Sequence, residues 1–412
     1  MDDYAAHFEQ AVVDTSVPYE TWQPKRSPSV KFKVAGLFAG VGGIEQGFRN
    51  AGHQTVLLAE QDDAAKKVLE KRFPDIRKHD DVRTLRGTSK ADLLTAGFPC
   101  QDLSQVGRCA GIEGPDSSLV GHVFDLLAKR GSNVKWLVLE NVPFMLRLDR
   151  GQAIAALVEK LEALGWAWAY RIVDARAFGL PQRRRRVVMV ASRDGDPRQA
   201  LLGQDSPPPN QKKRGQHACG FYWTEGNRGV GWAIDSIPPL KGGSGVSIPS
   251  PPAIWFPRRG LIATPTIEDA ERMQGFDAGW TAPAADAQRG DRRRWRLVGN
   301  AVSTRMSEWV ARRLSKDLRH YDDTNDTDLH GDMKWPDAAW GYDGERAASP
   351  VSDWPVERRQ EHLASFLKQD PIPLSLRATS GFWGRLQKSG LRYDEAFGED
   401  LATHVEGQKN RQ

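Results

Sequence analysis

Short apolar runs alternate with amphipathic stretches from Lys33 onward, and this alternation is the feature that most restricts the possible folds. The runs have the length of strands, and the stretches between them have the spacing of helices. Strand and helix repeated in this way predict an α/β fold, a mostly parallel sheet with helices on both faces. The expected strands span residues 34–39, 55–59, 92–97, 135–139, 169–173 and 186–192, and the clearest expected helix spans 151–165.

The alternation stops near Ser192. Residues 193–262 are rich in Pro, Gly, Lys and Arg and show little periodicity, so they predict a small irregular domain or a set of long loops. Helical spacing returns around Ile267 and Met273 and again over residues 301–314.

The composition excludes several classes of protein. The chain is 39% hydrophobic and 27% charged, which is typical of a globular protein, and its apolar runs are far shorter than the ~18 residues that span a bilayer. The first residues have neither the basic nor the apolar region of a signal peptide. The three cysteines, Cys100, Cys109 and Cys219, form no CxxC pair and predict neither a zinc site nor a disulfide framework. We therefore expect a cytoplasmic protein without a metal and without a membrane association.

A glycine-rich turn follows the first expected strand and opens a helix. Gly40, Gly42 and Gly43 allow a ligand to approach the backbone closely, and the start of the helix offers free N–H groups. Glu60 ends the next expected strand, where its carboxylate can accept ribose hydroxyls, and Asp81 can accept an adenine amino group. An ordinary turn with surface acids would contain the same residues, but their order favours a nucleoside cofactor. These features do not separate NAD from S-adenosylmethionine, although Gly-x-Gly-Gly differs from G-x-G-x-x-G and argues against a dinucleotide.

Two reactive residues follow later strands. Cys100 lies in a Gly-Phe-Pro-Cys-Gln turn just past a strand, where ligands bind in parallel sheets, and its thiolate would be a strong nucleophile. A buried, inert thiol is the alternative, and we expect it for Cys109 and Cys219. Glu140 ends another strand beside the apolar Leu139, so its carboxylate should lie at the mouth of the sheet. Alone it could cap a helix, but with Cys100 it suggests a nucleophile and a proton donor facing one pocket.

Taken in their order along the chain, the glycine turn, the acids after it, the cysteine turn and Glu140 resemble the motifs of the DNA (cytosine-5)-methyltransferases. The resemblance covers roughly residues 33–316. Three further segments carry the resemblance: Gln182-Arg183-Arg184-Arg185-Arg186, Arg272-Met273-Gln274-Gly275-Phe276 and Gly299-Asn300-Ala301-Val302-Ser303. The resemblance implies a Rossmann-like, S-adenosylmethionine-dependent methyltransferase sheet with a small irregular target-recognition domain. Two positions depart from the pattern: Asp277 stands where the family often has Pro, and Gln61 where some members have an aromatic that stacks on adenine.

The resemblance also implies the site residues. The cofactor S-adenosyl-L-methionine would contact Phe38, Ala39, Gly40, Gly42, Gly43, Ile44, Glu60, Asp81, Val82, Pro99, Leu119, Asn300, Ala301 and Val302. The catalytic residues would be Cys100, Glu140, Arg184 and Arg186, and the DNA contacts would be Gln101, Ser104, Gln182, Arg184 and Arg186.

The implied reaction makes carbon 5 of cytosine reactive through a covalent bond from Cys100 to carbon 6. Glu140 would hydrogen-bond ring nitrogen 3 and the exocyclic amine, and Arg186, with Arg184, would contact the base oxygen and nearby phosphates. Because none of this can happen in a stacked duplex, the base must be flipped out. The glycine-bearing segment after Cys100 would close over it as a lid.

These implications divide the chain into an N-terminal arm (1–32), a catalytic domain (33–192), a target-recognition region (193–298), a helix completing the catalytic domain (299–316) and an extension of unknown role (317–412). We expect a monomeric, bacterial or phage-encoded modification enzyme that acts on double-stranded DNA, together with a restriction endonuclease that cuts the same site. An RNA cytosine methyltransferase and a catalytically silent DNA-binding regulator are the alternatives. The basic recognition region favours duplex DNA, and the presence of both Cys100 and Glu140 argues against a silent regulator.

Charge is unevenly distributed along the chain. The formal net charge is +5, but residues 317–412 hold 12 Lys and Arg against 18 Asp and Glu, whereas residues 182–296 hold 19 against 11. Basic surfaces attract the phosphate backbone, so we expect salt-sensitive DNA binding over residues 182–296 and an extension turned away from phosphate. From the residues alone, Arg183–Arg186 favour a solvated charge run at the start of a strand, whereas Arg289 and Arg292–Arg296 would either contact phosphate or lie on the surface. Trp223, Trp232 and Trp255 are expected in a core.

Overall fold

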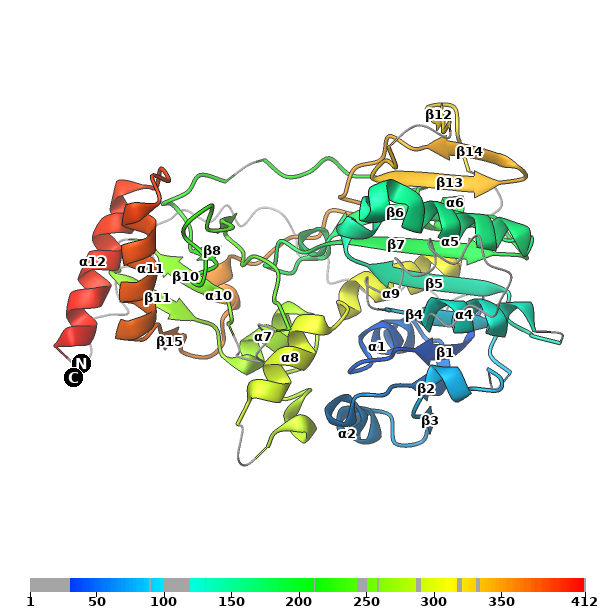
Figure 1. Cartoon of the computed structure of the whole chain (residues 1–412), viewed down its shortest axis with the longest axis horizontal. Helices are drawn as coiled ribbons and strands as arrows, with labels where there is room; N and C mark the ends of the chain where they lie inside the picture. Colours follow the sequence, from blue (N-terminus) through cyan, green and yellow to red (C-terminus); the bar gives the residue numbers. More distant parts are fainter. Residues whose placement is uncertain are drawn as a thin grey trace, which may run out of the picture.

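The computed structural model describes residues 30–88, 90–98, 119–129, 131–210, 212–242, 250–257, 259–286, 290–316, 321–330 and 334–410. These residues form two lobes (Figure 1). The large lobe contains a ten-stranded sheet covered by helices, and the small lobe contains a five-stranded sheet that carries the two C-terminal helices on one face. Within these ranges, no helix is long and apolar enough to cross a membrane.

The predicted parallel sheet forms the centre of the large lobe. Strands β3, β2, β1, β4 and β5 lie side by side in this order and pair in parallel, and β7 pairs antiparallel between β5 and β6. Each of the expected strands is present within two residues of its expected ends, whereas the short β3 (Arg77–His79) has no counterpart among them. The matching strands are β1 (Lys33–Leu37), β2 (Gln54–Ala59), β4 (Leu93–Ala96), β5 (Trp136–Asn141), β6 (Ala167–Asp174) and β7 (Arg185–Ser192).

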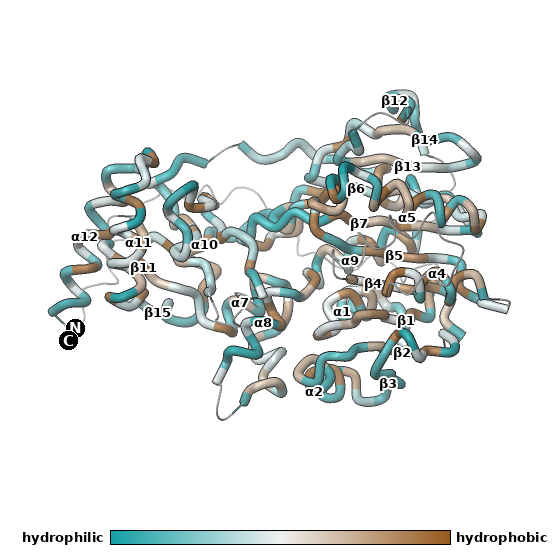
Figure 2. Tube along the Cα trace, in the orientation of Figure 1, coloured by the Kyte–Doolittle hydropathy of each residue, from teal (hydrophilic) through white to brown (hydrophobic). Residues whose placement is uncertain are grey.

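Helices cover both faces of this sheet because its strands point apolar side chains alternately to either side. Leu37 and Leu94 lie on the face covered by α4 and α5, and Val34 and Leu93 lie on the face covered by α1, α6 and α9. Figure 2 shows apolar residues gathered along these strands. The helices of the large lobe are α1 (Gly43–Asn50), α2 (Asp63–Arg72), α4 (Leu119–Ala128), α5 (Gln152–Ala163), α6 (Arg198–Leu201) and α9 (Thr304–Leu314).

The small lobe is built on an antiparallel sheet whose strands have two to four residues, in the order β15-β11-β10-β8-β9. Trp255 and Phe221 lie on the face covered by α11 and α12, and Ile254 and Phe256 lie on the face covered by α7, α8 and α10. Trp255 is therefore in the core, as expected, and so is the buried Cys219. The elements are β8 (Cys219–Phe221), β9 (Ala233–Ile234), β10 (Ala253–Phe256), β11 (Leu261–Thr264), β15 (Ile372–Pro373), α7 (Ile267–Met273), α8 (Arg292–Asn300), α10 (Leu363–Phe366), α11 (Leu376–Lys388) and α12 (Glu395–Lys409).

The C-terminal extension takes part in both sheets. Strand β13 (Ala338–Tyr342) pairs with β6, and β14 (Glu345–Ala348) and β12 (Thr327–Asp328) continue the large sheet at that edge. Further along, β15 pairs with β11 and leads into α11 and α12. The buried Asp235 after β9 holds this part of the chain, because its carboxylate accepts the Leu363 N–H at 2.8 Å and the His362 ring N–H at 2.7 Å. The extension therefore packs against both lobes.

Replacing Phe397 with Ala should destabilise the small lobe. The Phe397 ring on α12 is fully buried, and its centroid lies 5.2 Å from those of Phe221 and Trp255 and 4.7 Å from that of Trp232. Removal of a buried aromatic ring lowers the free energy of unfolding by about 3–5 kcal/mol, which urea denaturation followed by tryptophan fluorescence measures. Ile372→Ala on β15 is the matched control, because that side chain is 54% exposed and its loss should cost about 0.5 kcal/mol or less. Equal losses in the two variants would contradict the packing described for α12.

Candidate active site

A cavity of about 720 Å³ opens at the carboxyl ends of β1, β2, β4 and β5, the edge at which open α/β sheets bind ligands. A larger cavity of about 960 Å³ beside β6, β13 and β14 contains none of the predicted site residues. Glu140, Arg184 and Arg186 line the cavity at the strand ends. Every predicted cofactor residue that the structure describes, except Gly42, lines it as well: Phe38, Ala39, Gly40, Gly43, Ile44, Glu60, Asp81, Val82, Leu119, Asn300, Ala301 and Val302.

Two glycines at the start of α1, Gly42 and Gly43, pack too tightly against their neighbours to be replaced by a residue with a side chain. Gly42 has a φ of 81°, and a Cβ there would lie 2.4 Å from the Phe73 ring. A Cβ on Gly43 would lie 2.2 Å from the Val302 carbonyl oxygen. The Gly42 N–H closes the turn by donating to the Ala39 carbonyl at 2.8 Å. Glycine at these two positions therefore brings the start of α1 against the segment between α8 and α9.

Two carboxylates lie beside this turn. Glu60 accepts the N–H of Gly40 and the N–H of Asp62, each at 2.7 Å. Asp81 lies 2.6 Å from the guanidinium of Arg83, and this partner lowers the pKa of Asp81. Carboxylate oxygens are acceptors, so they can take hydrogen bonds from ribose hydroxyls and from an adenine amino group. The turn and its two acids therefore fit the nucleoside part of S-adenosylmethionine.

Glu140 at the end of β5 and Arg186 at the start of β7 form a largely buried ion pair. Nε of Arg186 lies 2.9 Å from Oε1 of Glu140, and the two side chains form an ion pair. Burial raises the pKa of Glu140, although the charges of Arg186 and Arg184 offset part of that rise. Burial also lowers the pKa of Arg186. The cavity therefore contains a carboxyl group that keeps its proton to a higher pH than an exposed glutamate does.

Asn141 connects the end of β5 to the turn that leads toward Cys100. Its side-chain amide donates to the Phe98 carbonyl at 3.1 Å. A Cβ on Gly97 would lie 3.7 Å from Oε2 of Glu140, so the ends of β4 and β5 are close together at this edge. The predicted residues Pro99, Cys100, Gln101 and Ser104, and also Cys109, lie outside the described residues.

Comparison with known proteins decides the family. The profile of the C-5 cytosine-specific DNA methylases matches residues 32–221. The type II methyltransferase M2.BsuMI of Bacillus subtilis is 44% identical over 378 residues, which cover 89% of this chain and 96% of the relative. The chain belongs to the C-5 cytosine-specific DNA methylase family. This methylase therefore acts on DNA and takes its methyl group from S-adenosylmethionine.

More distant matches show the fold of the methylase. The type II methyltransferase M.DsaV of Dactylococcopsis salina is 27% identical over 318 residues, 69% of this chain and 86% of the relative. The Dnmt2 methyltransferase of S. pombe has a TM-score of 0.51 at 14% identity, covering 69% of this chain and 98% of that chain. The Entamoeba histolytica methyltransferase EhMeth has a TM-score of 0.52 at 15% identity, covering 71% and 100%. The predicted Rossmann-like α/β fold is confirmed.

Gln182 and Arg184 of the methylase have internal partners. Gln182 is fully buried, and its side-chain carbonyl accepts the Leu240 N–H at 2.9 Å. The Arg184 guanidinium donates to the carbonyls of Leu240 at 3.0 Å, Gly299 at 3.1 Å and Ala301 at 2.9 Å. Both side chains join the large sheet to segments of the small lobe, and contact of either with DNA stays a prediction.

Asp62 and Arg296 line the cavity but are absent from the predicted set. Oδ1 of Asp62 caps α2 by accepting the N–H groups of Ala64 and Ala65 at 3.0 Å, and Oδ2 lies 2.5 Å from Arg296. This pair joins the large lobe to α8 at the cavity. An Asp just before a helical stretch is a recognisable N-cap signal, but its arginine partner is 234 residues away and has no local signal.

Replacing Gly43 with Ala should weaken cofactor binding by about tenfold or more, because the added Cβ would overlap the Val302 carbonyl oxygen and push α1 away from the cavity wall. Calorimetric titration with S-adenosylhomocysteine measures the affinity. Gly87→Ala is the matched control, since a Cβ there meets nothing within 4 Å. If Gly43→Ala bound S-adenosylhomocysteine as tightly as the wild type, the close approach of Gly43 to Val302 would not contribute to cofactor binding.

Glu45 of α1 makes stability depend on pH. Thr95 donates to its Oε1 at 2.8 Å, its Oε2 has no hydrogen-bond partner among the described residues, and burial raises the pKa of Glu45 from 4.5 to about 7. The folded state therefore holds a proton that the unfolded state releases between about pH 4.5 and 7, so stability falls as the pH rises through this window.

Glu45→Gln should remove this penalty and raise the free energy of unfolding at pH 8 by up to about 3 kcal/mol, with little change near pH 4. Urea unfolding at the two pH values measures the difference. Glu162→Gln is the control with the opposite expected sign. Burial alone would raise the pKa of Glu162, but its ion pair with Arg346 lowers it. Loss of the Glu162 charge should therefore destabilise the protein at pH 8. If Glu45→Gln lowered the free energy of unfolding at pH 8, the ionised Glu45 carboxylate would not destabilise the folded protein.

Proposed function

We propose that this DNA methylase forms a covalent adduct between Cys100 and carbon 6 of a cytosine turned out of the duplex, and then methylates carbon 5. The observation that carries the proposal is the buried Glu140–Arg186 pair in the cavity that also contains the glycine turn. Methyl transfer requires donor and base within bonding distance, so one cavity has to take both. Residues predicted for the base and for the cofactor line a single cavity, which supports this arrangement.

Glu140 supports activation of the base in the proposed mechanism. Addition of a thiolate to carbon 6 develops negative charge on ring nitrogen 3 and on the base oxygen. A carboxyl group with a raised pKa can hydrogen-bond nitrogen 3 in its protonated form and stabilise that charge. Arg186, whose Nε lies 2.9 Å from Glu140, can bind the base oxygen.

The proposed steps begin with the Cys100 thiolate, which adds to carbon 6. Carbon 5 then takes the methyl group, water takes the proton from carbon 5, and the electron pair of the broken C–H bond re-forms the double bond between carbons 5 and 6 and expels the thiolate. S-adenosylmethionine supplies the methyl group from its sulfonium. Gly40, Gly43 and Glu60 would hold the cofactor at the ends of β1 and β2, with Asp81 at the adenine.

The position of the Glu140–Arg186 pair supports base flipping as part of the proposal. The Glu140–Arg186 pair lines the cavity with little exposure to solvent, so we infer that a base leaves the duplex stack to reach it. Unstacking costs a few kcal/mol, which contacts to the extruded base offset. We infer that residues 33–192 and 299–316 form the catalytic unit that receives the cytosine, and that residues 193–298 contact the duplex.

We infer that the enzyme is the modification half of a type II restriction–modification system, because its Bacillus subtilis relative is a type II methyltransferase. Methylation would protect a DNA site from an endonuclease that cuts the same sequence. One chain contains both the cavity and the basic region, so the enzyme would act as a monomer.

DNA that carries 5-fluorocytosine tests the adduct, because fluorine on carbon 5 cannot leave as a proton does. The protein and S-adenosylmethionine should form a complex with this DNA that survives denaturing electrophoresis. Cys100→Ala should form none, whereas Cys219→Ala, which alters a buried free thiol on β8, should still form it. Glu140→Gln should slow the trapping about a hundredfold. An adduct with the Cys100 variant would overturn the proposal.

A further inference from the structure

We propose that Trp280 is a positioning residue for the cofactor: its indole N–H holds the glycine turn and couples cofactor binding to the segment between α7 and α8. This inference rests on the proposed placement of S-adenosylmethionine at the turn. Trp280 is absent from the residues that line the cavity, so it acts through the backbone of the turn and not by contact with the cofactor.

The contact between Trp280 and the turn is a buried hydrogen bond. Nε1 of Trp280 donates to the Val41 carbonyl at 2.9 Å, and the Trp280 side chain is only 4% exposed. Val41 lies between Gly40 and Gly42, which both have left-handed backbone conformations, with φ of 55° and 81°. The Gly40 N–H donates to Glu60 at 2.7 Å. The Trp280 bond therefore fixes the peptide group whose Gly42 N–H closes the turn, two peptide groups after the one that donates to Glu60.

Neighbouring side chains hold the indole in place. Trp280 stacks on Phe276 with ring centroids 5.0 Å apart and meets the edge of Phe73 at 6.3 Å. The guanidinium carbon of Arg72 lies 4.9 Å from the centre of the indole, and Nε of Arg72 donates to the Trp280 carbonyl at 3.0 Å. Phe73 is also the ring against which Gly42 packs. The indole and the turn therefore both pack against the Phe73 ring.

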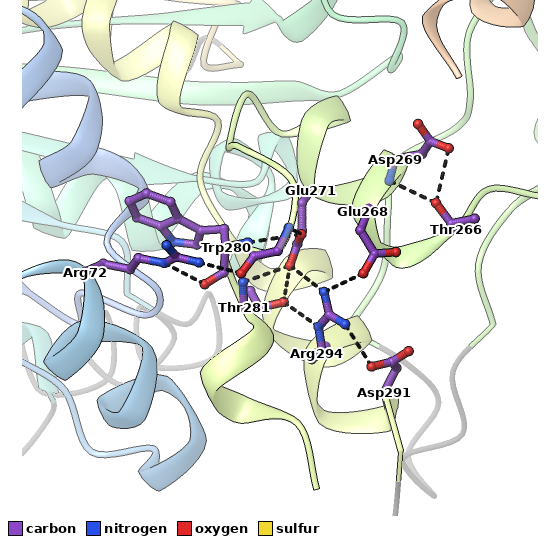
Figure 3. A network of polar contacts seen from close by, with 10 residues as sticks. Arg72, Thr266, Glu268, Asp269, Glu271, Trp280, Thr281, Asp291 and Arg294 are labelled. Atoms are coloured by element: carbon purple, nitrogen blue, oxygen red, sulfur yellow. Dashed lines mark hydrogen bonds and ion pairs between the residues drawn. The ribbon is translucent and has the colours of Figure 1, made fainter. Parts of the chain in front are cut away.

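A buried carboxylate fixes the loop that carries Trp280 (Figure 3). Glu271 of α7 is fully buried; its carboxylate accepts the N–H of Gly279 at 2.5 Å, the N–H of Trp280 at 3.2 Å and the N–H of Thr281 at 2.8 Å. Arg294 of α8 donates to the same carboxylate at 3.1 Å. One charge thus ties α7, the loop and α8 together.

Helix α8 brings this network back to the cavity. Arg294 also lies 3.1 Å from Glu268 on α7 and 3.0 Å from Asp291 before α8, so the start of α8 is fixed to α7. Later on the same helix, Arg296 and Leu297 line the cavity. Contacts through Glu271 and Arg294 therefore link the indole that bonds to the turn with the helix that carries two cavity-lining residues.

Trp280→Phe tests the hydrogen bond, because phenylalanine keeps an aromatic ring for stacking but has no N–H. The Val41 carbonyl then loses a buried partner, and the affinity for S-adenosylhomocysteine, measured by calorimetry, should fall by about three- to tenfold. The KM for S-adenosylmethionine should rise by a similar factor, with kcat and the affinity for DNA without cofactor within about twofold of the wild type.

Trp309→Phe is the matched control. Trp309 on α9 is also 4% exposed and donates its indole N–H at 3.4 Å to Gln204, away from the turn. Both variants should unfold at lower temperatures than the wild type, but only Trp280→Phe should lose cofactor affinity. Equal loss in the two variants, or unchanged affinity in Trp280→Phe, would overturn the role of Trp280.

Glu60→Ala separates this inference from the placement of the cofactor. If Glu60→Ala weakens cofactor binding and Trp280→Phe does not, the positioning role fails while the placement stands. If neither variant changes the affinity, the cofactor does not bind at the turn, and the inference falls with the placement.

Discussion

Close packing of α1 against the residues that follow α8 is the constraint on which the site depends. Gly43 and Gly47 lie one turn apart on α1, and a Cβ on either would meet backbone, the Val302 carbonyl oxygen at 2.2 Å or the Thr304 carbonyl oxygen at 2.6 Å. Glycine allows this approach because it has no side chain. Residues 38–41, 43 and 44 thereby line the same cavity as residues 300–302, which are far away in the chain.

The buried carboxyl groups differ in effect because their partners differ. Burial removes water from a charge, and a charged or hydrogen-bonding partner restores part of the solvation free energy that is lost. Glu271 has Arg294 and several backbone N–H groups, so it fixes a loop. Burial raises the pKa of Glu140, and the charges of Arg186 and Arg184 offset only part of that rise. Its carboxyl group is therefore suited to donating a hydrogen bond to a cytosine ring. Glu45 has a single hydroxyl partner and makes the fold sensitive to pH.

The small lobe depends on the C-terminal extension for its core. Strands of two to four residues bury too little apolar surface to be stable alone. Phe382 and Phe397 from the extension complete an aromatic cluster with Phe221 and Trp255. The acidic extension thus packs on one face of the small sheet, opposite the face covered by α7 and α8. It thereby stabilises the region that we propose to contact DNA.

The sequence by itself determined the strands of the large sheet, the glycine turn and the positions of Glu60 and Glu140. These are local properties: an apolar run sets a strand, and a carboxylate just past a strand lies at a known edge of a parallel sheet. Family resemblance then supplied the chemistry. Periodicity shows that a side chain is buried but not what it is buried against. Only the tertiary structure could therefore decide that Gln182 and Arg184 bond to backbone across the lobes, that Asp62 meets Arg296, and that an indole 239 residues away holds the cofactor turn.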